Sequence, residues 1–321
     1  MSIVEKAIGK LRSDARNNTG PVDQRRRADA PPPREPRGEG RPEPRAELRP
    51  EPPHFERPIH IAASDDCVAD TAPLRIDLDA LRAAGGLPPQ NAERQIADEY
   101  RRIKWPVLER AFGRADVALP ERNFVMVTSA LPGDGKTFTS LNLALSIARE
   151  RDSSVLLIDA DIARARMSEL LGIRQRPGLT ELLEHPGTDP ARHILATDIE
   201  GLRVMPAGRV SDQVPELMAS QRMRDLFAEL GARNRERVII FDSSPLLATN
   251  ESQVLAKLVG QVLMVVRANG TPRPAVEEAV SLLDRSRSIS LVLNQMRTVF
   301  GLGSYYSGYY NYNYGTGQGE S

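Results

Sequence analysis

The sequence predicts an α/β fold with a doubly wound, mostly parallel sheet, and three observations lead to this prediction. Short runs of Val, Ile, Leu and Met alternate with helical segments from about residue 115 onward, as expected of strands buried on both faces. A glycine-rich loop follows the first of these runs. Acidic residues end two further runs, and ligands of doubly wound folds bind at that edge of the sheet.

Each element follows from this alternation. The expected strands are Phe124–Ser129, Val155–Asp159, Leu202–Pro206, Val238–Asp242, Val262–Val266 and Leu291–Asn294. The expected helices between them are Lys136–Arg149, Arg164–Leu171, Gln221–Leu230, Gln253–Leu258 and Pro274–Ser286. A helical segment over 76–114 precedes this domain of residues 115–300. It contains a short helix at Leu78–Ala84 and a longer one at Asn91–Phe112, interrupted near Pro106 because proline lacks the amide hydrogen that a helix interior uses.

Composition describes the regions outside that domain. Residues 14–75 are rich in Pro, Arg and Glu and poor in large apolar side chains, so we predict a disordered spacer, with an Arg content that also suits anionic surfaces. Residues 1–13 carry apolar residues at helical spacing beside Lys6 and Lys10. This pattern fits an amphipathic helix that touches a membrane or a partner, and equally a packed terminal helix.

Charge and cysteine content limit the class of protein. The formal net charge is zero, so nothing global favours nucleic acid, and none is expected as a partner. The single Cys67 excludes an internal disulfide and a cysteine-bound metal cluster. The chain has no apolar run of about 18 residues and no secretory pattern at its start, which predicts a soluble, cytoplasmic protein.

The loop Ser129–Thr137 reads Ser-Ala-Leu-Pro-Gly-Asp-Gly-Lys-Thr and lies between a predicted strand and a predicted helix. This is the context of a phosphate-binding P-loop, in which glycines let backbone N–H groups approach phosphate oxygens at a helix N-terminus. We predict that Lys136 neutralises the β and γ phosphates and that the Thr137 hydroxyl binds Mg²⁺. Ala130 stands where the usual pattern begins with glycine. The predicted nucleotide-binding residues here are Pro132, Gly133, Asp134, Gly135, Lys136, Thr137 and Phe138.

Three carboxylates are predicted to join this loop. Asp159 and Asp161 end one strand and Asp242 ends another, which brings them to the edge of the sheet where the P-loop lies. Asp242 is expected to hold Mg²⁺ directly or through water. Asp159 and Asp161 are expected to orient the metal or to accept the proton of an attacking hydroxyl. An acid at a strand end is by itself often only a turn former, so the prediction depends on the three acids occurring together with the P-loop. The predicted catalytic residues are Lys136, Asp159, Asp161 and Asp242, and the predicted metal ligands are Thr137, Asp161 and Asp242.

The end of the chain is the second informative segment. Six of its seven tyrosines lie in the tail 301–321, at Tyr305, Tyr306, Tyr309, Tyr310, Tyr312 and Tyr314. Gly, Ser and Asn separate them, and about 20 flexible residues of this kind reach roughly 25 Å. A nucleotide site and a run of phenol hydroxyls in one chain suggest an enzyme that phosphorylates its own tail. The alternatives are a sticky low-complexity tract and a stacking surface for single-stranded nucleic acid, although the tail has no Lys or Arg to contact phosphates.

Together these segments resemble the bacterial tyrosine kinases of exopolysaccharide production, over about residues 92–314. The resemblance rests on the P-loop, on Leu157-Ile158-Asp159-Ala160-Asp161 and on Asp242-Ser243-Ser244-Pro245. It implies a P-loop NTPase core of the MinD/ParA-like type, ATP and Mg²⁺ as cofactors, and the tyrosine cluster as phosphoacceptor. It also implies that Asn294 contacts adenine. As partner it implies a transmembrane polysaccharide chain-length (copolymerase) protein at the inner membrane, and it leaves room for a cognate tyrosine phosphatase.

Partitioning and division-site ATPases share this core and are the main alternative, as spatial-organising ATPases without kinase activity. Their P-loop normally has a lysine at its second position, where this chain has Leu131. They also have no reason to end in clustered tyrosines. Arg164 and Arg166 follow Asp161 at a greater distance than the basic residues of the kinase family do, so the resemblance assigns them no role.

A helix before the first strand resembles the oligomerisation helix of the same kinases. Asp98, Arg101 and Lys104 occupy the three charged positions of its Glu-x-x-Arg-x-x-Arg pattern. Charges at this spacing project from neighbouring turns of a helix and can pair with another subunit, so the resemblance implies a ring-shaped homo-oligomer. An ordinary solvated helix face is the alternative.

Overall fold

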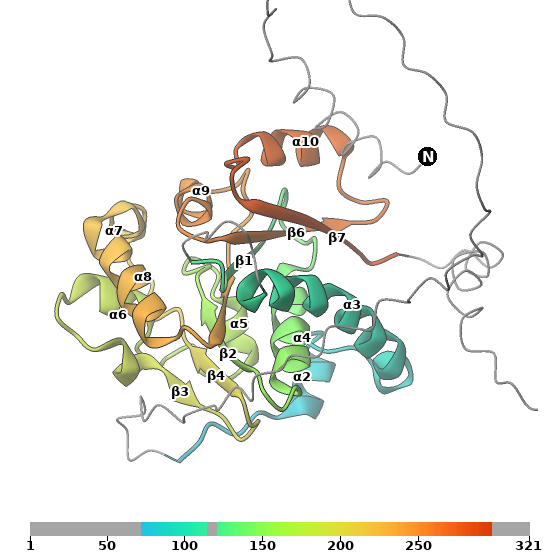
Figure 1. Cartoon of the computed structure of the whole chain (residues 1–321), viewed down its shortest axis with the longest axis horizontal. Coiled ribbons are helices and arrows are strands. Elements are labelled where there is room, and N and C mark those ends of the chain that lie inside the picture. Colours follow the sequence, from blue (N-terminus) through green and yellow to red (C-terminus); the bar gives the residue numbers. More distant parts are fainter. Residues whose placement is uncertain (1–71, 114–120, 297–321) are drawn as a thin grey trace, which may run out of the picture. The chain divides into compact units, whose positions relative to one another are not determined.

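A seven-stranded sheet organises the protein in a computed structural model that describes residues 72–113 and 121–296 (Figure 1). The strand order is β3-β4-β2-β5-β1-β6-β7, and all neighbours are parallel except β3 and β4. The strands are β1 (Phe124–Ser129), β2 (Ser154–Asp159), β3 (Leu195–Ala196), β4 (Leu202–Met205), β5 (Arg237–Asp242), β6 (Gln261–Arg267) and β7 (Ser288–Asn294). The predicted doubly wound, mostly parallel sheet is confirmed.

Helices cover both faces of the sheet because the strands are apolar on both faces. Along β1, Phe124 and Met126 face one core and Val125 and Val127 the other, and all four are inaccessible to solvent. The first core contains residues of α6 (Leu179–Glu184), α7 (Val214–Ala219), α8 (Gln221–Arg233), α9 (Asn250–Ala256) and α10 (Arg273–Ser281). The second contains residues of α3 (Glu93–Phe112), α4 (Lys136–Ala148) and α5 (Arg166–Leu170), and α2 (Leu78–Ala83) packs on α4 and α5.

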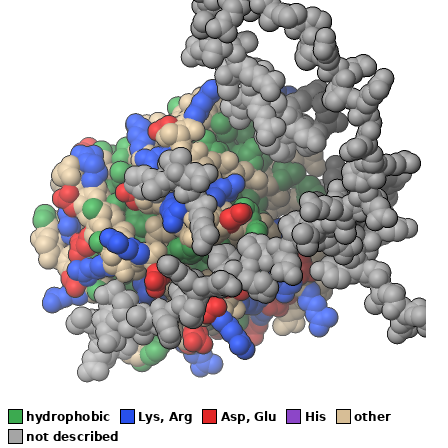
Figure 2. All heavy atoms as spheres, viewed as in Figure 1, with side chains coloured by type: hydrophobic (Ala, Val, Ile, Leu, Met, Phe, Trp, Pro, Cys, Tyr) green, Lys and Arg blue, Asp and Glu red, His purple; other side chains and the backbone are tan. Residues whose placement is uncertain are grey.

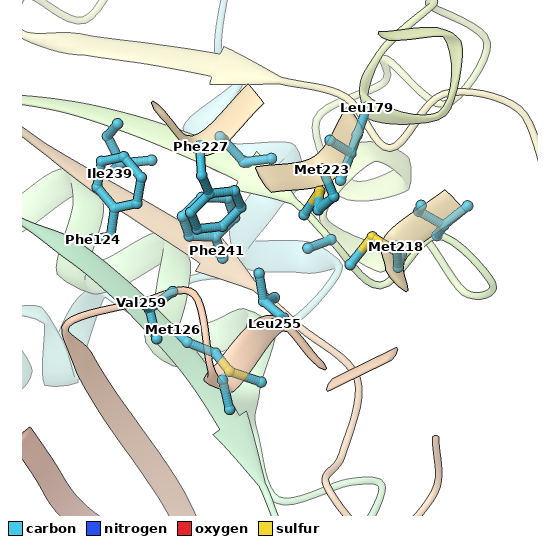
Figure 3. Packing of buried hydrophobic residues seen from close by; sticks show 14 of the residues in the cluster. Phe124, Met126, Leu179, Met218, Met223, Phe227, Ile239, Phe241, Leu255 and Val259 are labelled. Carbon is cyan, nitrogen blue, oxygen red and sulfur yellow. The ribbon is translucent and has the colours of Figure 1, made fainter. Parts of the chain in front are cut away.

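Three phenylalanines in mutual contact form the centre of the first core (Figure 3). Phe227 of α8 stacks on Phe241 of β5 with ring centroids 4.9 Å apart. Phe124 of β1 meets Phe227 edge-on, with centroids 5.2 Å apart. Aromatic rings prefer offset and edge-to-face arrangements, so this cluster fixes α8 against the two central strands that lead to the loops described below.

Several helices differ from the sequence prediction. The predicted interruption near Pro106 is wrong, because α3 runs without a break from Glu93 to Phe112. The proline removes one helical hydrogen bond, but Tyr100, Val107 and Ala111 are buried on both sides of it and hold the helix in place. The sequence does not predict β3, α6 or α7, since elements of two to six residues show too little periodicity to be recognised.

The first described residues lie beside β3, which forms one edge of the sheet. Leu74 N donates to Ala196 O at 2.8 Å, and Asp198 N donates to Leu74 O at 3.0 Å. Leu74, near the end of the predicted spacer, therefore pairs beside β3 as an isolated bridge to Thr197. The rest of that spacer, the terminal helix expected over 1–13 and the tyrosine tail lie outside the described residues. Within residues 72–113 and 121–296, no helix combines the length and the apolar composition that a membrane span needs.

Candidate functional site

The loop between β1 and α4 has the backbone of a phosphate cradle. Gly133 and Gly135 have φ angles of +85° and +97°, a left-handed conformation that glycine adopts without steric cost. A Cβ atom on Gly135 would lie 2.0 Å from Asn294 Nδ2, so space also requires glycine there. The helix α4 begins at Lys136, and no side chain caps its first N–H groups. Free N–H groups at a helix N-terminus attract phosphate.

Side chains from distant parts of the sequence hold this loop in shape. Asn294, at the end of β7, donates from Nδ2 to Asp134 O at 2.9 Å. The Asp134 carboxylate is buried, and its Oδ1 accepts a hydrogen bond from Thr271 Oγ1 at 2.7 Å. Ser129 Oγ donates to Leu131 O at 2.7 Å. The cradle is therefore fixed by both the preceding strand and the loops that follow β6 and β7.

The acidic strand ends meet beside this loop. The strand β5 lies between β1 and β2, and Asp242 pairs in register with Val127 of β1 and with Asp159 of β2. Asp161 follows β2 and accepts a hydrogen bond from Ser244 Oγ at 3.1 Å. The structure thus brings Asp159, Asp161 and Asp242 to the edge of the sheet at which α4 begins.

Asp159 is the most enclosed of the three acids. Its side chain is inaccessible to solvent, and Oδ2 accepts hydrogen bonds from Ser168 N at 2.8 Å and from Ser168 Oγ at 2.7 Å. Oδ1 accepts from Asp161 N at 3.3 Å. Burial and the neighbouring Asp242 charge raise the pKa of Asp159 to about 7, although the Ser168 hydrogen bonds oppose this. Because both of its carboxylate oxygens accept hydrogen bonds, Asp159 fixes the chain between β2 and α5.

The two carboxylate oxygens of Asp242 differ in their hydrogen bonding. Oδ1 accepts a hydrogen bond from Ser140 Oγ at 2.9 Å, whereas buried Oδ2 has no hydrogen-bond partner in the described part of the chain. Burial raises the pKa of Asp242 to about 6, and the Thr137 hydroxyl, Lys136 and Ser140 act in the opposite direction. A buried acceptor without a partner is costly, so this oxygen suits a cation or the water bound to one.

The donor set fits Mg²⁺ in particular. Mg²⁺ is commonly held by one or two carboxylates together with substrate phosphates, rather than by a complete cage of protein ligands. Residues 72–113 and 121–296 contain no group of three or more His, Cys, Asp or Glu side chains that could hold a metal ion. Asp242, Asp161 and the Thr137 hydroxyl could supply oxygen ligands beside the cradle.

Lys136 is the cation of this site. Its side chain is mostly buried. Burial lowers the pKa of the Lys136 ammonium group. The charges of Asp242 and Asp161 raise this pKa, and the nearby Arg164 lowers it. An ammonium group among carboxylates and directly after the glycine cradle is suited to bind the phosphate of a nucleotide.

The remaining predicted nucleotide-binding residues differ in placement. Pro132 and Gly133 are exposed at the tip of the loop. The Phe138 ring packs towards α3, with its centroid 6.4 Å from that of Tyr100, so only its backbone, in the first turn of α4, faces the cradle. Asn294 lies against the loop through its bond to Asp134.

Sequence reasoning missed the hydroxyl partners of these acids. Ser140 lies one helical turn after Lys136, so its spacing on α4 is a signal that could have identified it. Ser244 is close in sequence to Asp242. Ser168 and Thr271 have no such local signal, because the hydrogen bond of Thr271 spans 137 residues.

The expected oligomerisation surface needs one correction. Lys104 is not displayed to solvent: its side chain is 9% exposed, and it forms an ion pair with Glu150. Its Nζ also donates to Ser146 O at 3.0 Å, which ties α3 to α4 within the domain. Asp98 and Arg101 are exposed and pair with each other at 2.6 Å. Three-residue spacing does not distinguish an inward from an outward side chain on a helix packed on one face.

Comparison with known proteins agrees with this geometry. The family model described as "CobQ/CobB/MinD/ParA nucleotide binding domain" matches residues 125–279. The tyrosine-protein kinase YwqD of Bacillus subtilis is 30% identical over 201 residues, which cover 62% of this chain and 80% of that protein. The solved VpsO kinase domain is 31% identical with a TM-score of 0.53, covering 65% of this chain and all of that one.

Other relatives are much longer than this chain. The tyrosine-protein kinase wzc of Salmonella typhimurium is 32% identical over 197 residues, which are 60% of this chain. The matched region is only 27% of the Salmonella protein. The chain therefore spans about a quarter of the length of that relative.

Proposed function

Since the chain belongs to the bacterial tyrosine-protein kinases and has their MinD/ParA-like P-loop domain, we propose that it transfers the γ-phosphoryl group of ATP to its own tyrosines. The observation that carries the proposal is the meeting of Lys136, Asp161 and Asp242 beside the glycine cradle. The proposed acceptors lie outside the described residues and are Tyr305, Tyr306, Tyr309, Tyr310, Tyr312 and Tyr314.

Binding of ATP is proposed to use the backbone of the cradle first. The N–H groups of the loop and of the first turn of α4 hold the phosphates, while Lys136 neutralises their charge. Asn294, which is fixed against the loop, is proposed to contact the adenine. Because these groups are held before the nucleotide arrives, binding costs little reorganisation.

Transfer needs an acceptor for the phenol proton. The tyrosine oxygen forms the new bond to the γ phosphorus, the bond from that phosphorus to the β–γ bridging oxygen breaks, and ADP leaves. Asp161 is better placed than Asp159 to receive the phenol proton, because both oxygens of Asp159 already accept hydrogen bonds inside the protein. The phenol has an ordinary pKa near 10, so proton transfer can be late.

A magnesium ion would be held by Thr137 and Asp242, with Asp161 orienting it through water, so that an Asp161 oxygen stays available for the proton. When bound, it supplies positive charge to the phosphate oxygens. The buried Oδ2 of Asp242, which has no hydrogen-bond partner among the described residues, supports this assignment.

The cellular role is proposed from the family. We infer that the enzyme regulates exopolysaccharide chain length, polymerisation or export from the cytoplasmic side of the inner membrane. A transmembrane copolymerase would be its partner, and a cognate tyrosine phosphatase would reverse the modification. Asp98 and Arg101, which are exposed on α3, are proposed to contact a second subunit in a ring.

Labelling with γ-labelled ATP tests the proposal. We expect label on the tyrosine cluster, and intact-mass measurement should show added phosphate groups. Lys136→Met should abolish both, whereas the matched change of the exposed Lys257, Lys257→Met, should leave them intact. Phosphate release without any labelled protein would instead indicate a spatial-organising ATPase and would overturn the kinase assignment.

A further inference from the structure

Asp134 places a carboxylate inside the phosphate loop, where its charge opposes that of the ligand. It lies between two left-handed glycines and is 1% exposed. Its Oδ1 accepts the short hydrogen bond from Thr271 Oγ1, at 2.7 Å. Its Oδ2 accepts a longer one from Leu131 N, at 3.4 Å. Both oxygens are thus engaged by protein donors.

Thr271 is itself held firmly in the loop between β6 and α10. Its Oγ1 accepts a hydrogen bond from Arg267 N at 3.1 Å while it donates to Asp134. Its backbone N–H donates to Arg267 O at 3.0 Å. A hydroxyl that donates and accepts at once has its main hydrogen-bonding capacity satisfied, and consecutive bonds of this kind reinforce each other.

The end of β7 closes this network into a circuit. Ala268 N, in the β6–α10 loop, donates to Asn294 O at 2.8 Å. Asn294 Nδ2 then donates to Asp134 O at 2.9 Å. The phosphate loop is therefore tethered twice to segments that are distant in the sequence. The side chain of Asp134 is bound by the β6–α10 loop, and its backbone is bound by the end of β7.

We propose that Asp134 and Thr271 are positioning residues that lock the P-loop in its phosphate-binding shape and thereby set the affinity for nucleotide. The inference rests on the proposed function of this loop in ATP binding. Glycine-rich loops lose much conformational entropy when ordered, so a lock that orders the loop in advance strengthens binding. The lock acts on the phosphates that ATP and ADP share, and it leaves the transfer step unchanged.

The test compares nucleotide affinity with turnover. Thr271→Val keeps the shape of the side chain but removes the hydroxyl, and we expect the Kd of both ATP and ADP, measured by calorimetry, to rise about threefold to tenfold, as for one lost hydrogen bond. The KM for ATP in autophosphorylation should rise equally, while kcat stays within about twofold. Thr271→Ser should restore wild-type affinity. Thr188→Val, outside this network, is the matched control and should change nothing.

A double-mutant cycle decides whether the two residues act as one unit. Asp134→Ala should weaken binding as Thr271→Val does, and the double variant should be no weaker than the worse single one. Asp134→Asn keeps an oxygen that accepts from Thr271 but loses the acceptor for Leu131 N, so it should lose less affinity than Asp134→Ala. Wild-type affinity in both Thr271→Val and Asp134→Ala, or losses that multiply in the double variant, would overturn the lock.

Thermal denaturation identifies any variant that does not fold, and Thr271→Ser and Asp134→Asn then provide the comparison. For the proposal to stand, Thr271→Ser must bind like wild type and Asp134→Asn must bind more tightly than Asp134→Ala. The Kd of ADP is measured without tyrosine phosphorylation, so it tests the lock and not the kinase assignment. Either proposal can therefore fail while the other stands. A chain that binds ATP through the lock but never labels its tail would contradict the kinase assignment alone.

Discussion

Asp242 illustrates a conflict between stability and function within a single residue. Its carboxylate is buried, and one oxygen has no hydrogen-bond partner among the described residues. Burial disfavours the charged form and raises the pKa of Asp242 to about 6, compared with 3.8 as its ordinary value. Such a group destabilises the folded protein unless a cation arrives, as is common for residues selected for activity.

Asp242→Asn should therefore inactivate the enzyme and stabilise it at alkaline pH. The unfolded chain loses this proton near pH 4, while the folded one keeps it until about pH 6, so stability falls as pH rises through that window. We expect the variant to melt a few degrees higher than wild type at pH 8, with a smaller difference at pH 5, in circular dichroism. Labelling should fall about a hundredfold or more.

The matched control is Asp152→Asn, which changes an exposed carboxylate and should alter neither melting nor labelling. An Asp242→Asn variant that gains the same stability at pH 5 and pH 8 would show that the buried charge is not the cause.

At this scale the sequence predicts which residues meet but not how they are held. The P-loop motif and the acids at strand ends suffice to bring Lys136 and Asp242 to one edge of the sheet. The contacts that hold the loop are set by packing between distant segments: Thr271 and Asp134 are 137 residues apart. No local pattern encodes such a pair.

At the scale of elements, α3 shows how packing overrides local preference. It contains Pro106, yet buries Tyr100, Val107 and Ala111 along one side. Its Lys104 is turned inward to α4. The long, apolar strands were predictable because burial on both faces leaves a continuous signal, whereas two-residue β3 depends on its pairing with β4.

Lys104→Ala should destabilise the domain, because it leaves Ser146 O without this donor and removes the ion pair with Glu150. We expect a loss of about 1–2 kcal/mol in urea unfolding. Arg101→Ala, on the exposed side of the same helix, should change stability by less than about 0.5 kcal/mol, but should lower the oligomer mass in light scattering. If Lys104→Ala lowered only the mass, the inward assignment of Lys104 would be wrong.

At the scale of the whole molecule, the question is which active site each tail uses. On the face drawn in Figure 2, basic and acidic side chains are interspersed, so this face presents no large region of a single charge that would attract a tail. The length of the tail and the arrangement of subunits then decide which active site the tail uses. About 20 residues rich in Gly and Asn span roughly 25 Å if they behave as a random coil, which would permit the chain's own site or that of a neighbour in a ring.

We expect phosphorylation between molecules, because a neighbouring site can face the tail from outside. A chain lacking residues 303–321 supplies an active core without tyrosine acceptors, and full-length Lys136→Met supplies acceptors without activity. Neither should label alone, whereas the mixture should label the Lys136→Met chain. The same acceptor with Phe at all six clustered tyrosines should stay unlabelled. The contrary result is an unlabelled mixture together with a wild type that labels itself at a rate independent of concentration. Each tail would then be using its own site, and the exposed charges of α3 would have a role other than subunit contact.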